Sequence, residues 1–243
     1  PVAMNVYNNL TIHQSQASTA LAKISSGEKA ADPTLAATVG AATGLQSTLA
    51  ATQTAVSSTQ NAINVLQVAD SAYTEATALA QQGLALANDR NVSGADTSAI
   101  DAQLTTLEAA ISSIASNTQY NGTTVLGTAL TATVNATGTT MTVTPDAISS
   151  VSVSGDRVAD YTNAISSIVD SRAENAGNLS ALQGTVQVLQ STITNQQAAI
   201  GQVLDTDVAA EMMTLTSANI MTEAATAMLA QAMQMPNTVL KLL

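Results

Sequence analysis

The 243-residue chain contains no cysteine, no phenylalanine and no tryptophan, and four tyrosines are its only aromatic side chains. The absence of cysteine excludes disulfides and thiolate metal sites. Large aromatic side chains usually dominate a globular core, because each buries a large apolar area. Apolar residues still make up 46% of the chain, and they are mostly Ala, Leu, Val and Ile. This composition favours helices that lie close together along their length.

Charged side chains are also scarce, at 9% of the residues, and 17 acidic residues against 6 basic ones give a net charge of −11. Nucleic acid binding needs clustered Lys and Arg, and so does attraction to an anionic membrane surface. We therefore expect no nucleic acid partner. No run of about 18 apolar residues is present, so no membrane insertion is expected. The chain opens without a basic segment followed by an apolar stretch, so we expect no secretory signal peptide.

The sequence offers no constellation of residues for catalysis. His13 is the only histidine, and a metal or catalytic role would need converging partners, so we interpret it as a helix-surface residue. Gly40 and Gly44 are not followed by the Gly-Lys-Ser/Thr of a phosphate-binding loop. Asp205 and Asp207 would diverge on a helix, and Asp207 is expected to cap the N-terminus of one. We therefore expect no enzyme activity, no catalytic residues, no cofactor and no metal.

Two long stretches repeat their apolar residues every seven positions, which is the period of helices wrapped on partner helices. The first, 34–88, would be roughly 80 Å long as one helix at 1.5 Å per residue. The second is 158–204, and residues 100–114 carry a shorter helical pattern between them. One seam of the first stretch consists of Leu35, Ala42, Leu49, Val56 and Ile63, and a second, beside it, of Leu45, Leu66, Tyr73 and Ala80.

Residues rich in β-branched side chains lie between these helical stretches. Segments 130–134 and 140–144 flank Asn135-Ala-Thr-Gly138, a pattern typical of a β-hairpin. Tyr120-Asn-Gly122 predicts a turn just before the hairpin, and Val151–Val153 is a candidate further strand. The simplest fold is mainly α: a long antiparallel coiled-coil or helical-bundle rod with a small β-hairpin region, in which the N- and C-terminal helices are paired.

Both ends of the chain carry amphipathic helices, predicted at 4–26 and at about 208–235, with Pro236 ending the second. The C-terminal helix is apolar over much of its circumference, so one neighbour cannot cover it. Other subunits are the simplest source of further partners, through a head-to-tail interface that propagates into a filament. The residues expected to pack in this assembly are Tyr7, Leu10, Leu21, Ile24, Met212, Leu215, Ile220, Met221, Met228, Leu229, Ala232, Val239, Leu240, Leu242 and Leu243.

Several segments, in order along the chain, resemble motifs of bacterial flagellins. Ile24-Ser-Ser-Gly27 is similar to the LSSG segment of that family, Gln60–Gln67 to its N-D-G-I-S-x-x-Q stretch, and Gln119-Tyr-Asn-Gly122 to its Q-F-N-G. The tail is the most specific match. There Val203–Glu211 resembles I-E-D-S-D-Y-A-x-E, and Met228–Leu243 resembles V-L-A-Q-A-N-Q-x-P-x-x-V-L-x-L-L. The resemblance covers nearly the whole chain.

The resemblance implies a structural subunit that polymerises into the bacterial flagellar filament for swimming motility. Residues 1–32 and 205–243 would form an inner coiled coil of terminal helices, and residues 33–204 a helical rod with its β-hairpin at about 126–155. Only about 145–157 stands where flagellins usually insert outer domains, which implies a minimal form. The implied location is extracellular, in the flagellum. The implied partners are copies of the chain itself, the flagellar export apparatus, a flagellin chaperone, and the filament cap and junction proteins.

Three alternative interpretations of the chain remain open at this point. A hook–filament junction protein shares flagellin-like ends but assembles in few copies. A secreted helical adaptor would be a folded monomer with ordered ends. The methionine-rich C-terminal helix would also suit a hydrophobic ligand, although we favour packing between subunits.

Overall fold

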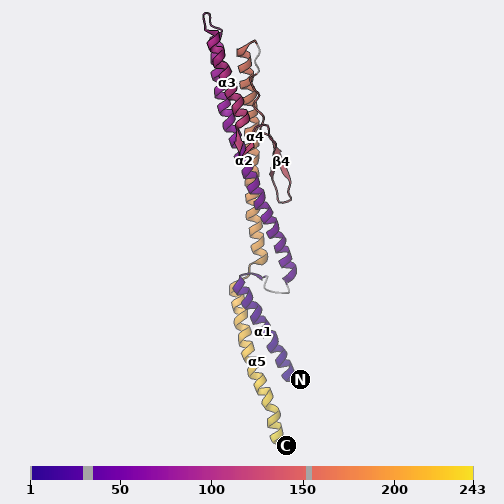
Figure 1. Cartoon of the computed structure of the whole chain (residues 1–243). Coiled ribbons are helices and arrows are strands. Elements are labelled where there is room, and N and C mark those ends of the chain that lie inside the picture. Colours follow the sequence, from indigo (N-terminus) through magenta and orange to yellow (C-terminus); the bar gives the residue numbers. More distant parts are fainter. Residues whose placement is uncertain (1, 30–34, 152–154, 243) are drawn as a thin grey trace. The chain divides into compact units, whose positions relative to one another are not determined.

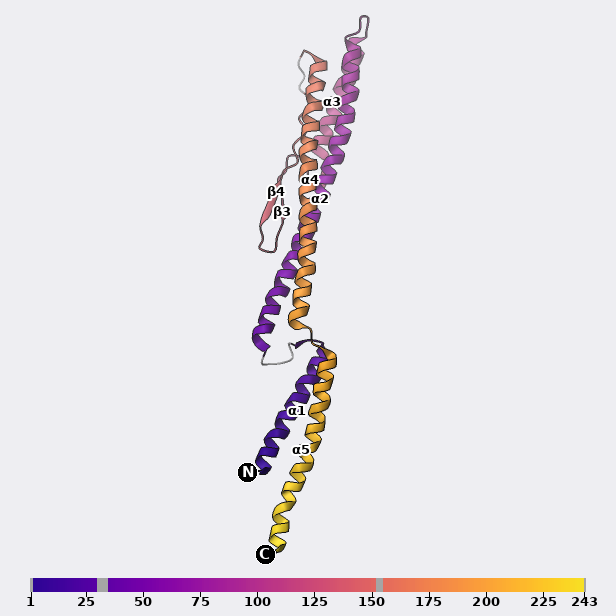
Figure 2. The same ribbon diagram turned by 180° about the vertical axis from the view of Figure 1, so that it is seen from behind.

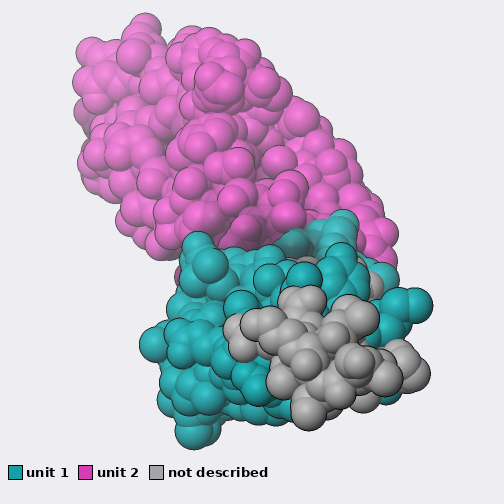
Figure 3. Space-filling view, turned by 90° about the horizontal axis from the view of Figure 1, so that it is seen from below, with its two compact units in different colours: residues 1–48, 195–243 teal, residues 49–194 magenta. Residues whose placement is uncertain are grey.

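The computed structural model describes residues 2–29, 35–151 and 155–242, and it is mainly α, as the sequence predicts (Figure 1). Contacts divide the chain into two units: unit 1 comprises 1–48 and 195–243, and unit 2 comprises 49–194 (Figure 3). In chain order the elements are α1 (Val2–Ser26), α2 (Ala36–Arg90), α3 (Thr97–Asn117), β1 (Gln119–Tyr120), β2 (Thr123–Thr124), β3 (Leu130–Thr133), β4 (Thr140–Val143), α4 (Arg157–Leu204) and α5 (Val208–Leu242).

The core of unit 2 is built from α2, α3 and α4, and small residues on α2 let these helices approach closely. Ala55, Ala62, Ala69 and Ala76 follow one another every seven residues, and each is at most 1% exposed. The next position in this row is Gly83, where an added Cβ would lie only 2.1 Å from Cε1 of Tyr161 on α4. The tyrosine ring therefore occupies the space that any other residue at position 83 would need.

Two fully buried tyrosines tie the elements of unit 2 together. The Tyr161 hydroxyl donates to the backbone oxygen of Leu104 on α3 at 3.2 Å, and the Tyr73 hydroxyl of α2 donates to that of Asp146 at 2.7 Å. Burial raises the pKa of Tyr161 to about 12 and that of Tyr73 still further. Both phenols therefore keep the protons that these hydrogen bonds need.

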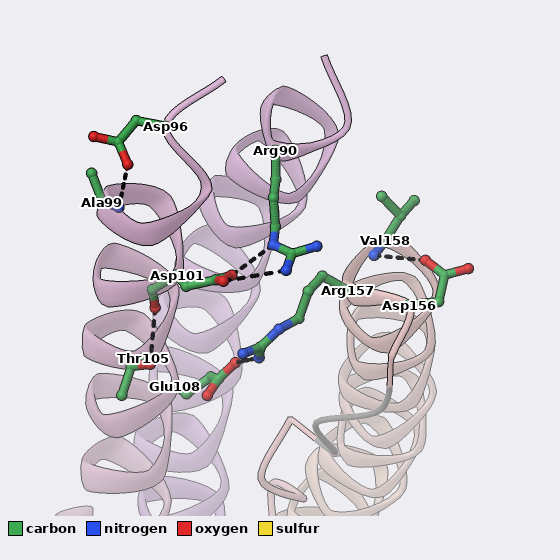
Figure 4. Close-up of polar contacts among 9 residues, drawn as sticks. All are labelled: Arg90, Asp96, Ala99, Asp101, Thr105, Glu108, Asp156, Arg157 and Val158. Carbon is green, nitrogen blue, oxygen red and sulfur yellow. Dashed lines mark hydrogen bonds and ion pairs between the residues drawn. The ribbon is translucent and has the colours of Figure 1, made fainter. Parts of the chain in front are cut away.

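Each pair of helices in unit 2 is joined by an arginine–carboxylate ion pair. Arg90 of α2 binds both oxygens of Asp101 of α3, at 2.7 and 3.2 Å, and Arg157 of α4 binds Glu108 of α3 (Figure 4). The third, Arg172 of α4, binds both oxygens of Asp70 of α2 at 2.8 and 3.3 Å. The hydrogen bond from Arg90 lowers the pKa of the Asp101 carboxyl. The planar, two-pronged contacts of Arg90 and Arg172 favour one orientation of the helices that they join.

The predicted β-hairpin is present as β3 and β4, which pair antiparallel with Leu130 opposite Val143. Its free edge lies on α2, where two neighbouring hydroxyls hold one residue of β3. Thr133 donates its backbone N–H to Ser58 Oγ at 3.0 Å, and its carbonyl accepts from Thr59 Oγ1 at 2.9 Å. Val143 of the hairpin is only 3% exposed and packs in the apolar core.

Some sequence-based expectations are corrected or fall outside the described residues. The turn at Tyr120-Asn-Gly122 is present, with positive φ at Asn121 and Gly122, but it also joins a short ladder of β1 and β2 that we did not predict. The expectation that Pro236 ends the last helix is wrong, because α5 continues to Leu242. Proline removes only one helical N–H donor. Val151 is not in a strand, whereas residues 152–154 and the predicted domain boundary at 32–33 lie outside the described residues.

Candidate assembly surface

In unit 1, α1 and α5 lie side by side and run in opposite directions, as both views show (Figures 1 and 2). Buried and half-buried side chains recur along each helix at alternating steps of four and three, which is the spacing of a coiled-coil seam. Small residues dominate the seam, so the two backbones come close. The seam consists of Val6, Leu10, His13, Ala17, Ala20 and Ile24 on α1, and Glu211, Leu215, Ala218, Thr222, Ala225, Leu229 and Ala232 on α5.

Polar contacts fix one end of this helix pair. Lys23 of α1 lies 3.3 Å from Glu211 of α5, and both side chains are less than a fifth exposed. Asp207 caps α5, as predicted: its Oδ1 accepts the N–H groups of Ala209 and Ala210 at 3.0 and 3.2 Å. Together these contacts set where α5 begins relative to the end of α1.

The segments that follow α1 and precede α5 are joined by backbone contacts. Gly27 has φ +74°, a conformation that favours glycine, and its N–H donates to the carbonyl of Lys23 at 2.8 Å. The carbonyl of Gly27 in turn accepts the N–H of Thr206 at 3.1 Å, and Glu28 forms an antiparallel bridge with Asp205. The serine–glycine segment and the segment before α5 therefore form one joint.

His13 is half-buried on the side of α1 that faces α5, rather than on its outer surface. Its Nδ1 lies 3.1 Å from Oε1 of Gln16, and it borders the groove between the helices together with Met213 and Met221. Within residues 2–29, 35–151 and 155–242 no group of three or more His, Cys, Asp or Glu side chains could hold a metal ion. His13 thus faces the partner helix rather than a metal site.

Large apolar side chains that are exposed gather on the paired terminal helices. Four of those in the described part of the chain lie on α1 and seven on α5, against three elsewhere. Such a concentration marks a surface that needs a further partner. The α1 residues are Met4, Tyr7, Ile12 and Leu21, the α5 residues are Val208, Met212, Met213, Ile220, Met221, Met228 and Met233, and the others are Val92, Val169 and Val188.

On α5 the exposed residues fall on more than one side of the helix. Met213 and Ile220 are seven residues apart, so they lie above one another on the side opposite the seam. Met221 and Met228 form a second such row beside them. Val208 and Met212 lie on the other flank of the seam, and all of these side chains are at least 47% exposed. α1 therefore covers only one of the apolar sides of α5.

The predicted packing residues divide into three groups in the structure. Tyr7, Leu21, Met212, Ile220, Met221 and Met228 are exposed, whereas Leu10, Ile24, Leu215, Leu229 and Ala232 are half-buried between α1 and α5. Val239, Leu240 and Leu242 belong to α5, but their side chains, and the whole of Leu243, lie outside what the structure describes.

Sequence reasoning missed the most buried residues of the seam, because it gave more weight to large side chains than to alanine. Val6 and Ala20 on α1, and Ala218 and Ala225 on α5, are all less than 9% exposed. The signal was their spacing, which continues the alternating steps of four and three. It was hidden by Tyr7 and Leu21, one position further along from Val6 and Ala20.

None of the described helices is long and apolar enough to cross a membrane.

Comparison with known protein families gives two matches, which together cover most of the chain. The bacterial flagellin N-terminal helical region matches residues 1–131, and the bacterial flagellin C-terminal helical region matches residues 160–243.

Individual relatives are similar to the chain over parts of their length. A flagellin of Halalkalibacterium halodurans is 39% identical over 101 residues, 37% of each protein. A putative flagellin of Bacillus subtilis, YvzB, is 34% identical over 120 residues, which are 44% of this chain and 75% of that protein. The match thus spans about a third of the first relative's length. The crystal structure of Bacillus cereus flagellin has a TM-score of 0.48 at 24% identity, covering 58% of this chain and 93% of that one.

Proposed function

The chain belongs to the bacterial flagellin family, and on that premise we propose that it is a structural subunit that polymerises into the flagellar filament for swimming motility. The observation that carries the proposal is the concentration of exposed apolar residues on α1 and α5. These faces are unfavourable in water and would be buried between neighbouring copies of the chain.

The geometry of α5 supports a polymer rather than a closed pair of subunits. α1 covers one apolar side of α5, while the row of Met213 and Ile220 and the row of Met221 and Met228 stay exposed. These two exposed rows face different directions, so burying both requires contacts with other copies on different sides of α5. A heterologous interface repeated in this way extends into a helical assembly.

We propose the same division of labour that the sequence suggested. The terminal helices, 1–32 and 205–243, form an inner coiled coil, and residues 33–204 form the outer helical rod with its hairpin. The pairing of α1 with α5 and the joint between Gly27 and Thr206 support this division, whereas the contacts within the chain divide the units at 48/49 and 194/195.

The remaining parts of the proposal concern the route to the filament. The subunit would leave the cell through the flagellar export apparatus and function outside the cell. Before assembly a flagellin chaperone would cover the apolar C-terminal helix, and in the filament the end subunits would meet the cap and junction proteins. The family membership is the support for these partners.

Electron microscopy of the purified chain, after polymerisation is induced with salt to screen the charge of −11, tests the proposal. We expect long uniform tubes. The double variant Met221→Asp/Met228→Asp places two charges on an exposed row of α5 and should form none. Val92→Asp is the matched control, because Val92 is as exposed (62%) but lies in the loop after α2, and it should assemble normally.

Other outcomes would replace the proposal. Short stubs or discrete rings from the unaltered chain would indicate a junction protein. A stable monomer whose two ends resist protease would indicate a helical adaptor. Tubes that form equally well from the Met221→Asp/Met228→Asp variant would show that α5 does not carry the assembly contacts.

A further inference from the structure

Methionine is concentrated on a single helix. The chain has eight methionines, and six of them lie on α5. The five of these whose side chains the structure describes are all exposed, between 47% and 69%. They are Met212, Met213, Met221, Met228 and Met233.

We propose that these exposed methionines of α5 are a peroxide-sensitive modification site, at which conversion to methionine sulfoxide prevents polymerisation. The inference rests on the proposed function, because it concerns the surface through which copies would pack. In the reaction the thioether sulfur attacks one oxygen of hydrogen peroxide. The O–O bond breaks, an S=O bond forms, the sulfur is oxidised, and the other peroxide oxygen leaves as water.

Because these methionines lie outside the α1–α5 seam, their oxidation should leave the fold of the subunit unchanged. Among the residues whose burial the structure describes, no methionine occupies the α1–α5 seam, which is built there from aliphatic residues, His13, Thr222 and Glu211. Met212, Met213 and Met221 instead line a shallow groove on the outer side of α5 together with Ile220, and Met228 continues the row of Met221. Met213 and Met221 also border the groove between α1 and α5, but neither is a seam residue, so we expect an oxidised chain to keep its own helix pair and to lose its fit to other copies.

The chemistry explains why the effect on packing is large. Methionine is flexible and apolar, and it fills irregular gaps between helices. The sulfoxide is polar and chiral, and burying it without a hydrogen-bond donor is unfavourable. A single unpaired sulfoxide at each interface raises the critical concentration for polymerisation about tenfold or more. Methionine sulfoxide reductases reverse the modification, so the loss of polymerisation should be reversible.

The test uses the full chain, treated as a monomer with hydrogen peroxide. Mass spectrometry of its peptides locates the sulfoxides, circular dichroism follows helix content, and sedimentation gives the critical concentration. We expect sulfoxide on the α5 methionines, unchanged helix content and a critical concentration raised at least about tenfold. Reduction by the A and B classes of methionine sulfoxide reductase should restore polymerisation.

Two variants separate α5 from the other methionines. Replacing all six α5 methionines by leucine conserves volume and should abolish the sensitivity to peroxide. The control, Met4→Leu/Met141→Leu, leaves α5 unaltered and should remain sensitive. Met4 is the exposed methionine of α1 and Met141 is half-buried in β4.

The two proposals fail in different ways. If the untreated chain forms no tubes, the proposed function fails. If the untreated chain forms tubes and the oxidised chain does so at the same concentration, only the redox inference is overturned. It is also overturned if the six-leucine variant stays as sensitive to peroxide as the unaltered chain, or if reductase treatment removes the sulfoxides without restoring assembly.

Discussion

The backbone of α2 packs directly against the ring of Tyr161 at Gly83, because glycine has only a hydrogen atom in place of a side chain. An added Cβ would lie 2.1 to 2.6 Å from three ring carbons, and the ring is itself held by its hydrogen bond to Leu104. The glycine therefore belongs to the packing of α2 against α4, although glycine inside a helix normally lowers its stability.

Gly83→Ala should destabilise unit 2 by about 1–3 kcal/mol, because the ring of Tyr161 must leave its position. The free energy of unfolding in urea measures the effect. Gly177→Ala is the matched control. Gly177 lies in α4 with no atom near an added Cβ, so this change should stabilise the chain by about 0.5–1 kcal/mol. Equal effects of the two substitutions would contradict the close contact at Gly83.

At the scale of elements, the attachment of the β3–β4 hairpin depends on adjacent hydroxyls of one helix. In the ladder Val134 donates to Thr139, so the backbone groups of Thr133 point away from β4. Ser58 and Thr59 satisfy both of those groups from α2. The unpaired backbone groups of a free strand edge can pair with another strand, and here side chains of α2 bind those groups instead.

Ser58→Ala should speed hydrogen exchange at the backbone amide of Thr133, because this N–H loses its acceptor. Amide exchange followed by NMR measures the change, which we expect to be about fivefold or more for a hydrogen bond of about 1 kcal/mol. Ser57→Ala is the control. The Ser57 hydroxyl is exposed and bonds only to the carbonyl of Gln53 within α2. If both variants leave exchange at Thr133 unchanged, the hydroxyl does not hold the hairpin.

The elements themselves could largely be predicted from the sequence, because each is encoded by a local pattern. The seven-residue repeat predicted α2 and α4, the β-branched runs predicted β3 and β4, and Asp207 was recognised as a cap. Which face of α1 meets α5 was less clear. The choice between Val6 and Tyr7 depends on the partner helix, and the small residues that α5 presents favour the smaller seam. The contact between Gly83 and Tyr161 has no local signal, because it joins residues 78 positions apart.

At the scale of the whole molecule, assembly and folding are assigned to different parts of the chain. The core of unit 2 is completed by residues of α2, α3, α4 and the segments between them. Unit 1 carries most of the large apolar side chains that are exposed in the described part of the chain. The chain therefore contains one region that satisfies its own packing and another with exposed apolar surface, which we propose is buried by further copies.

Removing residues 228–243 should abolish polymerisation and leave unit 2 folded. The deletion takes away Met228, Met233 and the last turns of α5 but no residue of the unit 2 core. Electron microscopy checks for tubes, while circular dichroism and limited proteolysis check the fold of 49–194. Loss of the protease-resistant core in the shortened chain would contradict the division between the two units.

The helix pair of unit 1 is unequal: α5 has 35 residues and α1 has 25. Counted from the contact between Lys23 and Glu211, the described part of α5 extends about ten residues further than the described part of α1, which is roughly 15 Å at 1.5 Å per residue. Such an overhang gives the subunit a direction. In the head-to-tail polymer that we propose, every copy points the same way, so the two ends of the polymer present different surfaces and should grow at unequal rates.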